Sequence, residues 1–325
     1  MKHFKNAVIF LVVITMAFFL IAGCGEDTAP VDEEVVDEEA AVDEEEAAVE
    51  EEPYTVNLAA KGWSENMTLG YMAALLIEEH TVHSVDTSKI NMGPTEMLHP
   101  ALVEGQIDIY PEYTGTSWMV VLGEEDIISD RREIYEKSRD AYLEEFGIVM
   151  MEPIGFQNTF AIAMKPERAE ELGVNTLSEL AEIEDLTFIG DNTTFTRPDL
   201  YQGLAETYGI DMDGIDRVIV DTSFFYEALA QEEGDVTTLF STDGRLKEYG
   251  FIILEDDKNF FPPYDAIYVV RQEVLEEYPS IGEALEPLFG TIDEETMIEL
   301  NYLVEVQMED PEDVAREYLE SEGLL

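Results

Sequence analysis

Short β-rich runs alternate with amphipathic helical segments from Tyr54 to the end of the 325-residue chain. This alternation restricts the fold to the α/β class, in which helices connect the strands of largely parallel sheets. The number of strands over this length favours two sheets, and hence two lobes. Strands are expected at residues 55–60, 90–92, 107–110, 148–151, 160–164, 187–189, 218–220, 238–240, 252–254 and 266–270.

Helical segments fill most of the intervals between these runs. Asp310 before Pro311, with acidic residues in the following turn, is typical of a helix start. Helices are expected at residues 65–80, 130–146, 177–181, 199–208, 224–232, 281–289, 294–306 and 311–322.

Acidic residues dominate the charge of the chain. Asp and Glu number 74 against 17 Lys and Arg, for a formal net charge of -57. This balance argues against a nucleic-acid partner and against electrostatic docking to an anionic membrane. Residues 25–52 hold 15 of the acids, so the excess also extends over the folded part. Salt near 1 M shortens the Debye length to about 3 Å, and a high-salt environment is therefore inferred.

The N-terminus resembles a secretory signal. Lys2 and Lys5 precede an apolar run from Ala7 to Ala22, and Cys24 follows in an Ile-Ala-Gly-Cys sequence similar to a bacterial lipobox. Residues 1–23 are expected to be a signal peptide and Cys24 the lipidation site. An uncleaved transmembrane anchor is the alternative, but the run is short for a span. Both interpretations place the protein outside the cytoplasm, attached to the cell membrane.

Residues 24–53 are expected to form a tether. Their sequence is almost entirely acidic residues, Ala and Val, and like-charged low-complexity segments of this kind remain extended. Because Cys24 is the sole cysteine, an intrachain disulfide and a thiolate metal cluster are both excluded.

Groups that could carry out catalysis are few. His80 and His83 could share a metal, although a histidine near a helix C-terminus is common without one. The sequence contains no phosphate-binding glycine loop. No cofactor or metal is expected, and nothing in the sequence favours an enzyme.

Aromatic and hydroxyl residues gather instead in segments that begin or end predicted strands. In open α/β sheets ligands bind beyond the strand ends, and aromatic rings there could enclose a cation, with a quaternary ammonium ion as the natural guest. Core packing is the alternative for any single ring. The segments are KGWSEN (61–66), DIYPEYTGTSW (108–118), GFQNTF (155–160), LFSTDGR (239–245) and FFPPYDA (260–266).

These segments, with TRPDLYQGL and LNYLVEVQ, resemble those of extracytoplasmic substrate-binding lipoproteins of ABC importers for glycine betaine, choline and carnitine. The resemblance covers residues 54–325. It implies the two-lobed type II periplasmic-binding-protein fold with the ligand in the cleft between lobes. Lobe 1 would comprise residues 54–155 and 264–325, and lobe 2 residues 156–263. It also implies a monomer that delivers its ligand to an ABC permease for osmoprotective uptake.

The resemblance assigns two groups of ligand-binding residues. The rings of Tyr113, Phe160, Phe240 and Tyr264 would enclose the trimethylammonium group, with backbone contacts from Asn158. Relatives often carry tyrosine where this chain has Phe160 and Phe240. A second group, Lys61, Thr116 and Arg197, would hold the carboxylate end of the ligand.

Glycine betaine or proline betaine is the expected ligand, because Lys61 and Arg197 favour a carboxylated molecule. A choline or carnitine receptor is the alternative within the same class. A lipid-anchored enzyme on a similar fold and a structural surface lipoprotein are two further alternatives from other classes.

Overall fold

The computed structural model describes residues 51–197, 200–211 and 214–325, which belong to one compact unit. The predicted signal peptide, Cys24 and most of the predicted tether lie outside these residues. Within the described ranges, no helix combines the length and the apolar character needed to cross a membrane.

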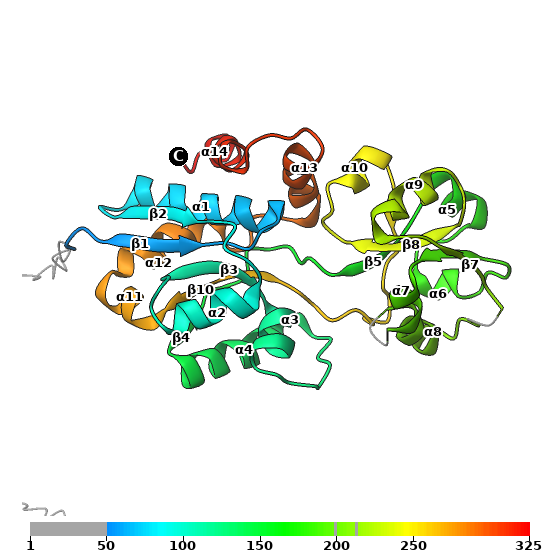
Figure 1. The fold of residues 1–325 in the computed structure, drawn as a ribbon, viewed down its shortest axis with the longest axis horizontal. Helices are drawn as coiled ribbons and strands as arrows, with labels where there is room; N and C mark the ends of the chain where they lie inside the picture. The colour runs from blue at the N-terminus through cyan, green and yellow to red at the C-terminus, as the bar shows by residue number, and fades with distance from the viewer. Residues whose placement is uncertain (1–50, 198–199, 212–213) are drawn as a thin grey trace, which may run out of the picture. The chain divides into compact units, whose positions relative to one another are not determined.

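Two five-stranded sheets form the framework (Figure 1). The first has the order β2-β1-β3-β10-β4 and the second the order β7-β6-β8-β5-β9. The strands are β1 (Thr55–Ala59), β2 (Ser84–Lys89), β3 (Ile109–Tyr113), β4 (Ile148–Met150), β5 (Phe160–Met164), β6 (Thr187–Gly190), β7 (Asp216–Ile219), β8 (Val236–Phe240), β9 (Ile252–Ile253) and β10 (Ala266–Arg271).

Both sheets are mixed, which corrects the expectation of largely parallel sheets. In the first, β1 pairs in parallel with β2 and β3, whereas β10 is antiparallel to β3 and β4. In the second, β6 is parallel to β7 and β8, whereas β5 is antiparallel to β8 and β9. The exceptions β5 and β10 directly follow the two segments that lead from one sheet to the other. Each sheet draws its strands from one predicted lobe, although the lobe boundaries themselves stay a prediction.

Helices cover both faces of the sheets, and strand alternation explains how. Ala266, Tyr268 and Val270 join the core formed with α1, α12, α13 and α14, while Ile267 and Val269 join the core formed with α2 and α4. The helices are α1 (Ser64–His80), α2 (Thr95–Val103), α3 (Thr114–Thr116), α4 (Arg131–Phe146), α5 (Pro166–Leu172), α6 (Leu177–Leu180), α7 (Asn192–Thr196), α8 (Tyr201–Tyr208), α9 (Phe225–Ala230), α10 (Arg245–Tyr249), α11 (Gln272–Glu277), α12 (Pro279–Leu285), α13 (Glu294–Glu305) and α14 (Pro311–Ser321).

Two strand predictions were wrong. The second strand lies at Ser84–Lys89 instead of residues 90–92, because its polar sequence lacks the usual apolar signal. The third strand continues through Pro111 to Tyr113. β1 pairs with β3 through Leu58 and Ile109, so the edge of β3 that faces β1 has no strand partner at Pro111. A proline, which lacks a backbone N–H, is therefore tolerated at this position. There the Pro111 carbonyl accepts from Asn66 Nδ2 at 2.9 Å.

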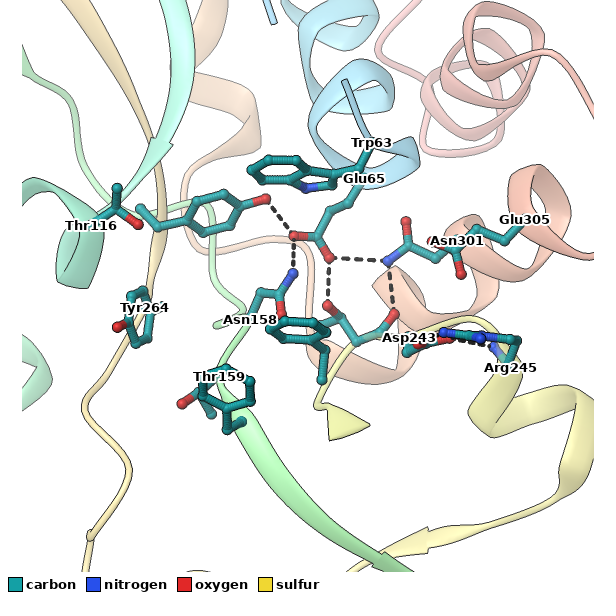
Figure 2. Close-up of a pocket in the computed structure, with 14 residues that line it drawn as sticks. Trp63, Glu65, Thr116, Asn158, Thr159, Asp243, Arg245, Tyr264, Asn301 and Glu305 are labelled. Carbon is teal, nitrogen blue, oxygen red and sulfur yellow. Dashed lines mark hydrogen bonds and ion pairs between the residues drawn. The ribbon is translucent and has the colours of Figure 1, made fainter. Parts of the chain in front are cut away.

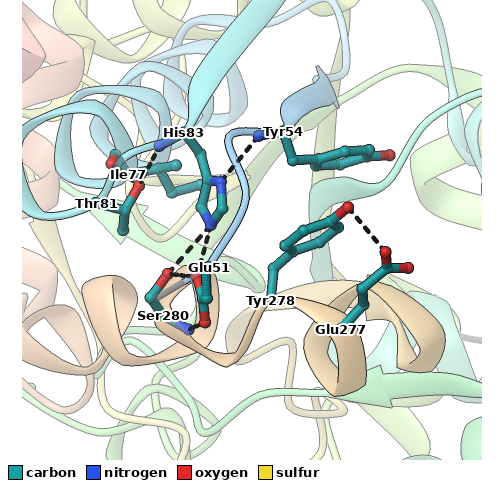
Figure 3. Close-up of polar contacts among 8 residues, drawn as sticks. All are labelled: Glu51, Tyr54, Ile77, Thr81, His83, Glu277, Tyr278 and Ser280. Atoms are coloured by element: carbon teal, nitrogen blue, oxygen red, sulfur yellow. Dashed lines mark hydrogen bonds and ion pairs between the residues drawn. The ribbon is translucent and has the colours of Figure 1, made fainter. Parts of the chain in front are cut away.

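The end of the predicted tether is bound to the folded part (Figure 3). His83 Nδ1 accepts from the Tyr54 backbone N–H at 3.2 Å, and His83 Nε2 lies 2.8 Å from Glu51 Oε2. Glu51 Oε1 in turn accepts from the Ser280 backbone N–H at 3.0 Å. Glu51 is therefore fixed against the start of α12, and the expected extended segment does not include it.

His80 and His83 do not share a site. His80 Nε2 lies 2.7 Å from the carbonyl oxygen of Leu324, far in sequence from the partners of His83. Residues 51–197, 200–211 and 214–325 contain no group of three or more His, Cys, Asp or Glu side chains that could hold a metal ion.

Candidate ligand-binding site

One cavity of about 480 Å³ collects most of the predicted ligand-binding residues (Figure 2). Its lining comes from both predicted lobes, at the ends of strands β3 and β8, at the starts of α1 and β5, and from α13. The lining residues are Trp63, Glu65, Tyr113, Thr116, Asn158, Thr159, Phe160, Phe240, Thr242, Asp243, Arg245, Tyr264, Asn301 and Glu305.

Five aromatic rings line the cavity. Phe160 and Phe240 face each other across the β5–β8 pair and stack with ring centroids 4.9 Å apart. Trp63 stacks on Tyr113 with centroids 6.2 Å apart. Phe240 is 50% exposed and Trp63 41% exposed, so neither ring is committed to the core. These rings can therefore offer their faces to a cation that enters the cavity.

Tyr264 is positioned by Gly115 of the DIYPEYTGTSW segment. A Cβ on Gly115 would lie 2.7 Å from the Tyr264 ring and 2.8 Å from the Pro263 carbonyl oxygen. A backbone hydrogen bond joins the same two segments, since the Thr114 N–H donates to the Asp265 carbonyl at 3.0 Å. Gly115 thus allows the segment before β10 to approach the end of β3, which brings Tyr264 to the cavity wall.

Glu65 holds the network of hydrogen bonds in the cavity wall. Its Oε1 accepts from Tyr113 Oη at 2.6 Å and from Asn158 Nδ2 at 2.9 Å. Its Oε2 accepts from Thr242 Oγ1 at 2.5 Å and from Asn301 Nδ2 at 3.0 Å. Burial and the adjacent Glu65 carboxylate raise the pKa of the Tyr113 hydroxyl, which therefore stays a donor.

Arg245 contributes a positive charge to the lining, and its guanidinium group is paired with the Asp243 carboxylate. Arg245 Nη2 donates to Asp243 Oδ2 at 2.7 Å, and its Nε donates to Oδ1 at 3.1 Å. These bonds raise the pKa of the Arg245 guanidinium further above its usual range. Glu305 accepts from the Gly244 N–H at 3.1 Å and from Ser64 Oγ, and burial raises the pKa of its carboxyl group.

Lys61 lies outside this lining. Its ammonium group forms a buried ion pair with Glu112, and both side chains are at most 2% exposed. The Lys61 Nζ lies 5.2 Å from the Trp63 ring centroid and 5.0 Å from that of Tyr113. Burial lowers the pKa of the ammonium group, although Glu112 opposes this shift. Lys61 therefore lies against two cavity rings, and its charge is compensated by the Glu112 carboxylate.

Arg197 lines a second cavity, of about 280 Å³, beside the first. Both cavities share Phe160, Phe240, Asp243 and Arg245. The Arg197 guanidinium carbon lies 5.7 Å from the Phe160 ring centroid. Of the eight predicted ligand-binding residues, six therefore line the main cavity, Arg197 lies next to it, and Lys61 does not line it.

Sequence reasoning missed several lining residues. Glu65, Thr242, Asp243 and Arg245 belong to segments that were selected for their aromatic residues, and Asn301 belongs to LNYLVEVQ. In a chain with 74 acidic residues, a single carboxylate carries little signal. The position of Glu65, in the first turn of a helix directly after Trp63, was the available indication.

Comparisons with known proteins identify the family. The family described as the substrate-binding domain of ABC-type glycine betaine transport systems matches residues 54–321. The chain is 34% identical over 268 residues to the ergothioneine transport permease/ergothioneine-binding protein of Helicobacter pylori, covering 82% of this chain and 47% of that protein. It is 32% identical over 269 residues to the carnitine transport binding protein of Listeria monocytogenes, covering 82% of this chain and 86% of the relative.

A solved structure of a glycine betaine/carnitine/choline ABC transporter protein agrees with this assignment. It superimposes with a TM-score of 0.76 at 30% identity, covering 83% of this chain and 99% of that chain. The fold is thus the two-lobed α/β fold of periplasmic binding proteins. The chain belongs to the family of substrate-binding domains of ABC-type glycine betaine transport systems. Members of this class bind a small molecule outside the cytoplasm and work with an ABC permease.

Proposed function

We propose that this protein binds a quaternary ammonium compatible solute and delivers it to an ABC permease. The observation that carries the proposal is the set of aromatic rings, Trp63, Tyr113, Phe160, Phe240 and Tyr264, around one cavity. A quaternary ammonium ion cannot donate a conventional hydrogen bond, and its attraction to a ring face is worth about 0.5–2 kcal/mol per ring. The relatives named for glycine betaine, carnitine and ergothioneine transport support this ligand class.

The acid end of a betaine would be held by Thr116 and Arg197. Thr116 lines the main cavity, and Arg197 lies in the adjoining one behind the Phe160 ring. An arginine can bind a carboxylate through two parallel hydrogen bonds. Lys61 has less support for this role, since its ammonium group already pairs with Glu112. Glycine betaine and proline betaine remain the proposed ligands, with choline or carnitine as the alternative.

The proposal includes no catalysis. It also includes the expectations for the N-terminal residues, namely removal of the signal peptide, lipidation of Cys24 and an acidic tether to the membrane that ends before Glu51. Apart from the end of the tether, these expectations depend on the sequence alone. The osmoprotective role follows from the ligand class together with the net charge of -57, which suits a saline environment.

Calorimetric titration of the purified protein tests the function. The panel is glycine betaine, proline betaine, carnitine, choline and ergothioneine, each at low salt and in 2 M NaCl. We expect micromolar binding of at least one betaine. Folded protein that binds no member of the panel would overturn the proposal and return attention to the enzyme and structural alternatives.

The five aromatic rings that line the cavity, here called the aromatic cage, are tested by the substitution Phe240→Ala. Phe240 is half exposed, so its loss should remove a cage wall with little effect on stability. We expect affinity to fall by about 2- to 30-fold, the equivalent of one cation–π contact. Phe224→Ala is the matched control, because Phe224 is 57% exposed and does not line the cavity. Equal affinities for Phe240→Ala and wild type would contradict the cage.

A further inference from the structure

Glu65 and Asp243, two carboxylates of the main cavity, differ in how their charge is compensated. The four hydrogen-bond donors to Glu65 are two hydroxyls and two amides, all of them neutral. Asp243, by contrast, receives two hydrogen bonds from the Arg245 guanidinium. Glu65 is only 1% exposed, so water does little to screen its carboxylate. The cavity wall therefore holds a buried carboxylate with no cation among its hydrogen-bond partners. The Lys61 ammonium interacts with Glu65 through space but pairs directly with Glu112.

The surroundings of Glu65 add to this negative potential. Asn158 and Asn301 turn their amide N–H groups toward Glu65 (Figure 2), and their Oδ1 atoms are buried without a hydrogen-bond partner among the described residues. Unpaired buried acceptors of this kind call for a positively polarised group. The methyl groups of a quaternary ammonium ion carry such partial positive charge, and they need no donor or acceptor in a fixed direction.

The hydrogen bonds of Glu65 also connect distant parts of the chain. Tyr113 is at the end of β3, Asn158 precedes β5, Thr242 follows β8, and Asn301 is on α13. Glu65 itself lies in the first turn of α1, where the helix dipole favours a carboxylate. The same side chain thus provides charge and fixes the positions of four lining residues, three from segments next to strands of both sheets and one from α13.

We propose that Glu65 sets the charge preference of the site: its carboxylate is the counter-charge of the ligand's quaternary ammonium group, and its hydrogen bonds position the cage. This inference rests on the proposed function, because it concerns a ligand that carries a quaternary ammonium group. It adds a specificity-determining residue that acts through charge, beyond the aromatic rings and beyond Thr116 and Arg197, which are proposed to hold the carboxylate.

Matched ligand pairs separate charge from shape. Choline and 3,3-dimethylbutan-1-ol differ by a carbon in place of the charged nitrogen, as do glycine betaine and 3,3-dimethylbutanoate. The ratio of the two dissociation constants within a pair measures how strongly the site prefers the charged nitrogen. Binding would be measured by calorimetry or by the fluorescence of Trp63. For the fluorescence experiment Trp118 is replaced by Phe, which leaves Trp63 as the single tryptophan.

For Glu65→Gln we expect this ratio to shrink at least tenfold relative to wild type, because the charged ligand loses more than its uncharged isostere. Glu65→Asp keeps the charge and should restore the ratio, even if both ligands bind more weakly. Thr242→Val removes one donor and keeps the carboxylate, so it should also preserve the ratio. Glu299→Gln is the control for overall charge, since Glu299 is an exposed partner of Lys247 on the same helix as Asn301.

Three results would overturn the inference. If Glu65→Gln weakens both members of a pair equally, the role of Glu65 is structural. If wild type itself shows a ratio below about threefold, the site has no charge preference, and this result does not depend on any variant folding. If folded wild type binds neither choline nor any betaine, the proposed function fails and the inference fails with it. The first two results leave the proposed function intact.

Discussion

Lys61 illustrates how much a single residue's role depends on its partner. The family resemblance implies that Lys61 holds the ligand's carboxylate, and its position in an aromatic segment is compatible with that role. In the structure Glu112, 51 residues away in sequence, takes the ammonium group. Glu112 also accepts from Thr95 Oγ1 at 2.8 Å and from the Tyr113 N–H at 2.9 Å. Lys61 thus contributes to the wall behind Trp63 and Tyr113 as part of a buried polar cluster.

Substitution Lys61→Met should therefore act mainly on stability. Removing one partner leaves the Glu112 charge buried without compensation, which costs about 3–5 kcal/mol of unfolding free energy. Glu112→Gln in the same chain should recover part of this loss. Chemical denaturation measures both values. We expect the affinities for glycine betaine and choline to change by similar factors, and a selective loss of glycine betaine would instead show that Lys61 contacts the ligand's carboxylate.

At the scale of elements, the contact between α10 and α13 fixes one side of the cavity. Asn301 Nδ2 donates to the Thr242 carbonyl at 2.8 Å, and Glu305 accepts from the Gly244 N–H. Lys247 on α10 pairs with Glu299 on α13. The backbone at Gly244 approaches α13 so closely that an added Cβ would lie 2.5 Å from the Tyr302 nitrogen. Glycine is required here for space alone, because its φ of -59° is open to any residue.

Gly244→Ala should push the segment before α10 away from α13. The clash involves helix backbone, which cannot yield as a flexible side chain can, so we expect a loss of about 1–3 kcal/mol in stability. Ligand affinity should fall as well, since Thr242 and Asp243 move with the segment. Thermal unfolding and calorimetric titration measure these effects. Gly282→Ala on α12 is the matched control, because its added Cβ would meet only side-chain atoms, the nearest at 3.3 Å. Equal results for both variants would contradict the importance of this contact.

At the scale of the whole molecule, the acidic excess governs the response to salt. The chain has 74 acids against 17 bases, so repulsion among the acids exceeds their attraction to the bases. This net repulsion weakens as the Debye length shortens. The fold must therefore tolerate a large self-repulsion at low ionic strength. The same excess leaves many carboxylates near each base, as in the pairing of Arg168 with both Glu171 and Asp235.

We expect the melting temperature to rise steeply with NaCl between 0.05 and 0.5 M, where screening changes most, and more gradually up to 2 M. Differential scanning calorimetry at constant pH measures this dependence. Sucrose at matched osmolality is the control, because it does not screen charge. A melting temperature that stays constant below 0.5 M NaCl would contradict the inference of a protein suited to high salt.

The sequence by itself determined the α/β class, the two-sheet organisation, the family and most of the aromatic rings, because these depend on local periodicity and on motifs. Tyr113, Thr116, Asn158, Phe160, Phe240 and Tyr264 were all assigned from such segments and line the main cavity. Even so, polar β2 and the continuation of β3 through Pro111 escaped prediction, since sheet pairing decided both.

Only the tertiary structure decided which charged groups belong to the site. Glu65 receives its hydrogen bonds from residues 48, 93, 177 and 236 positions away, and Lys61 finds Glu112 across 51 positions. No local pattern encodes such pairings in a chain so rich in acids. The physical reason is that a buried charge takes its role from the donors, rings and charges packed around it, and these meet only when the sheets and helices are assembled.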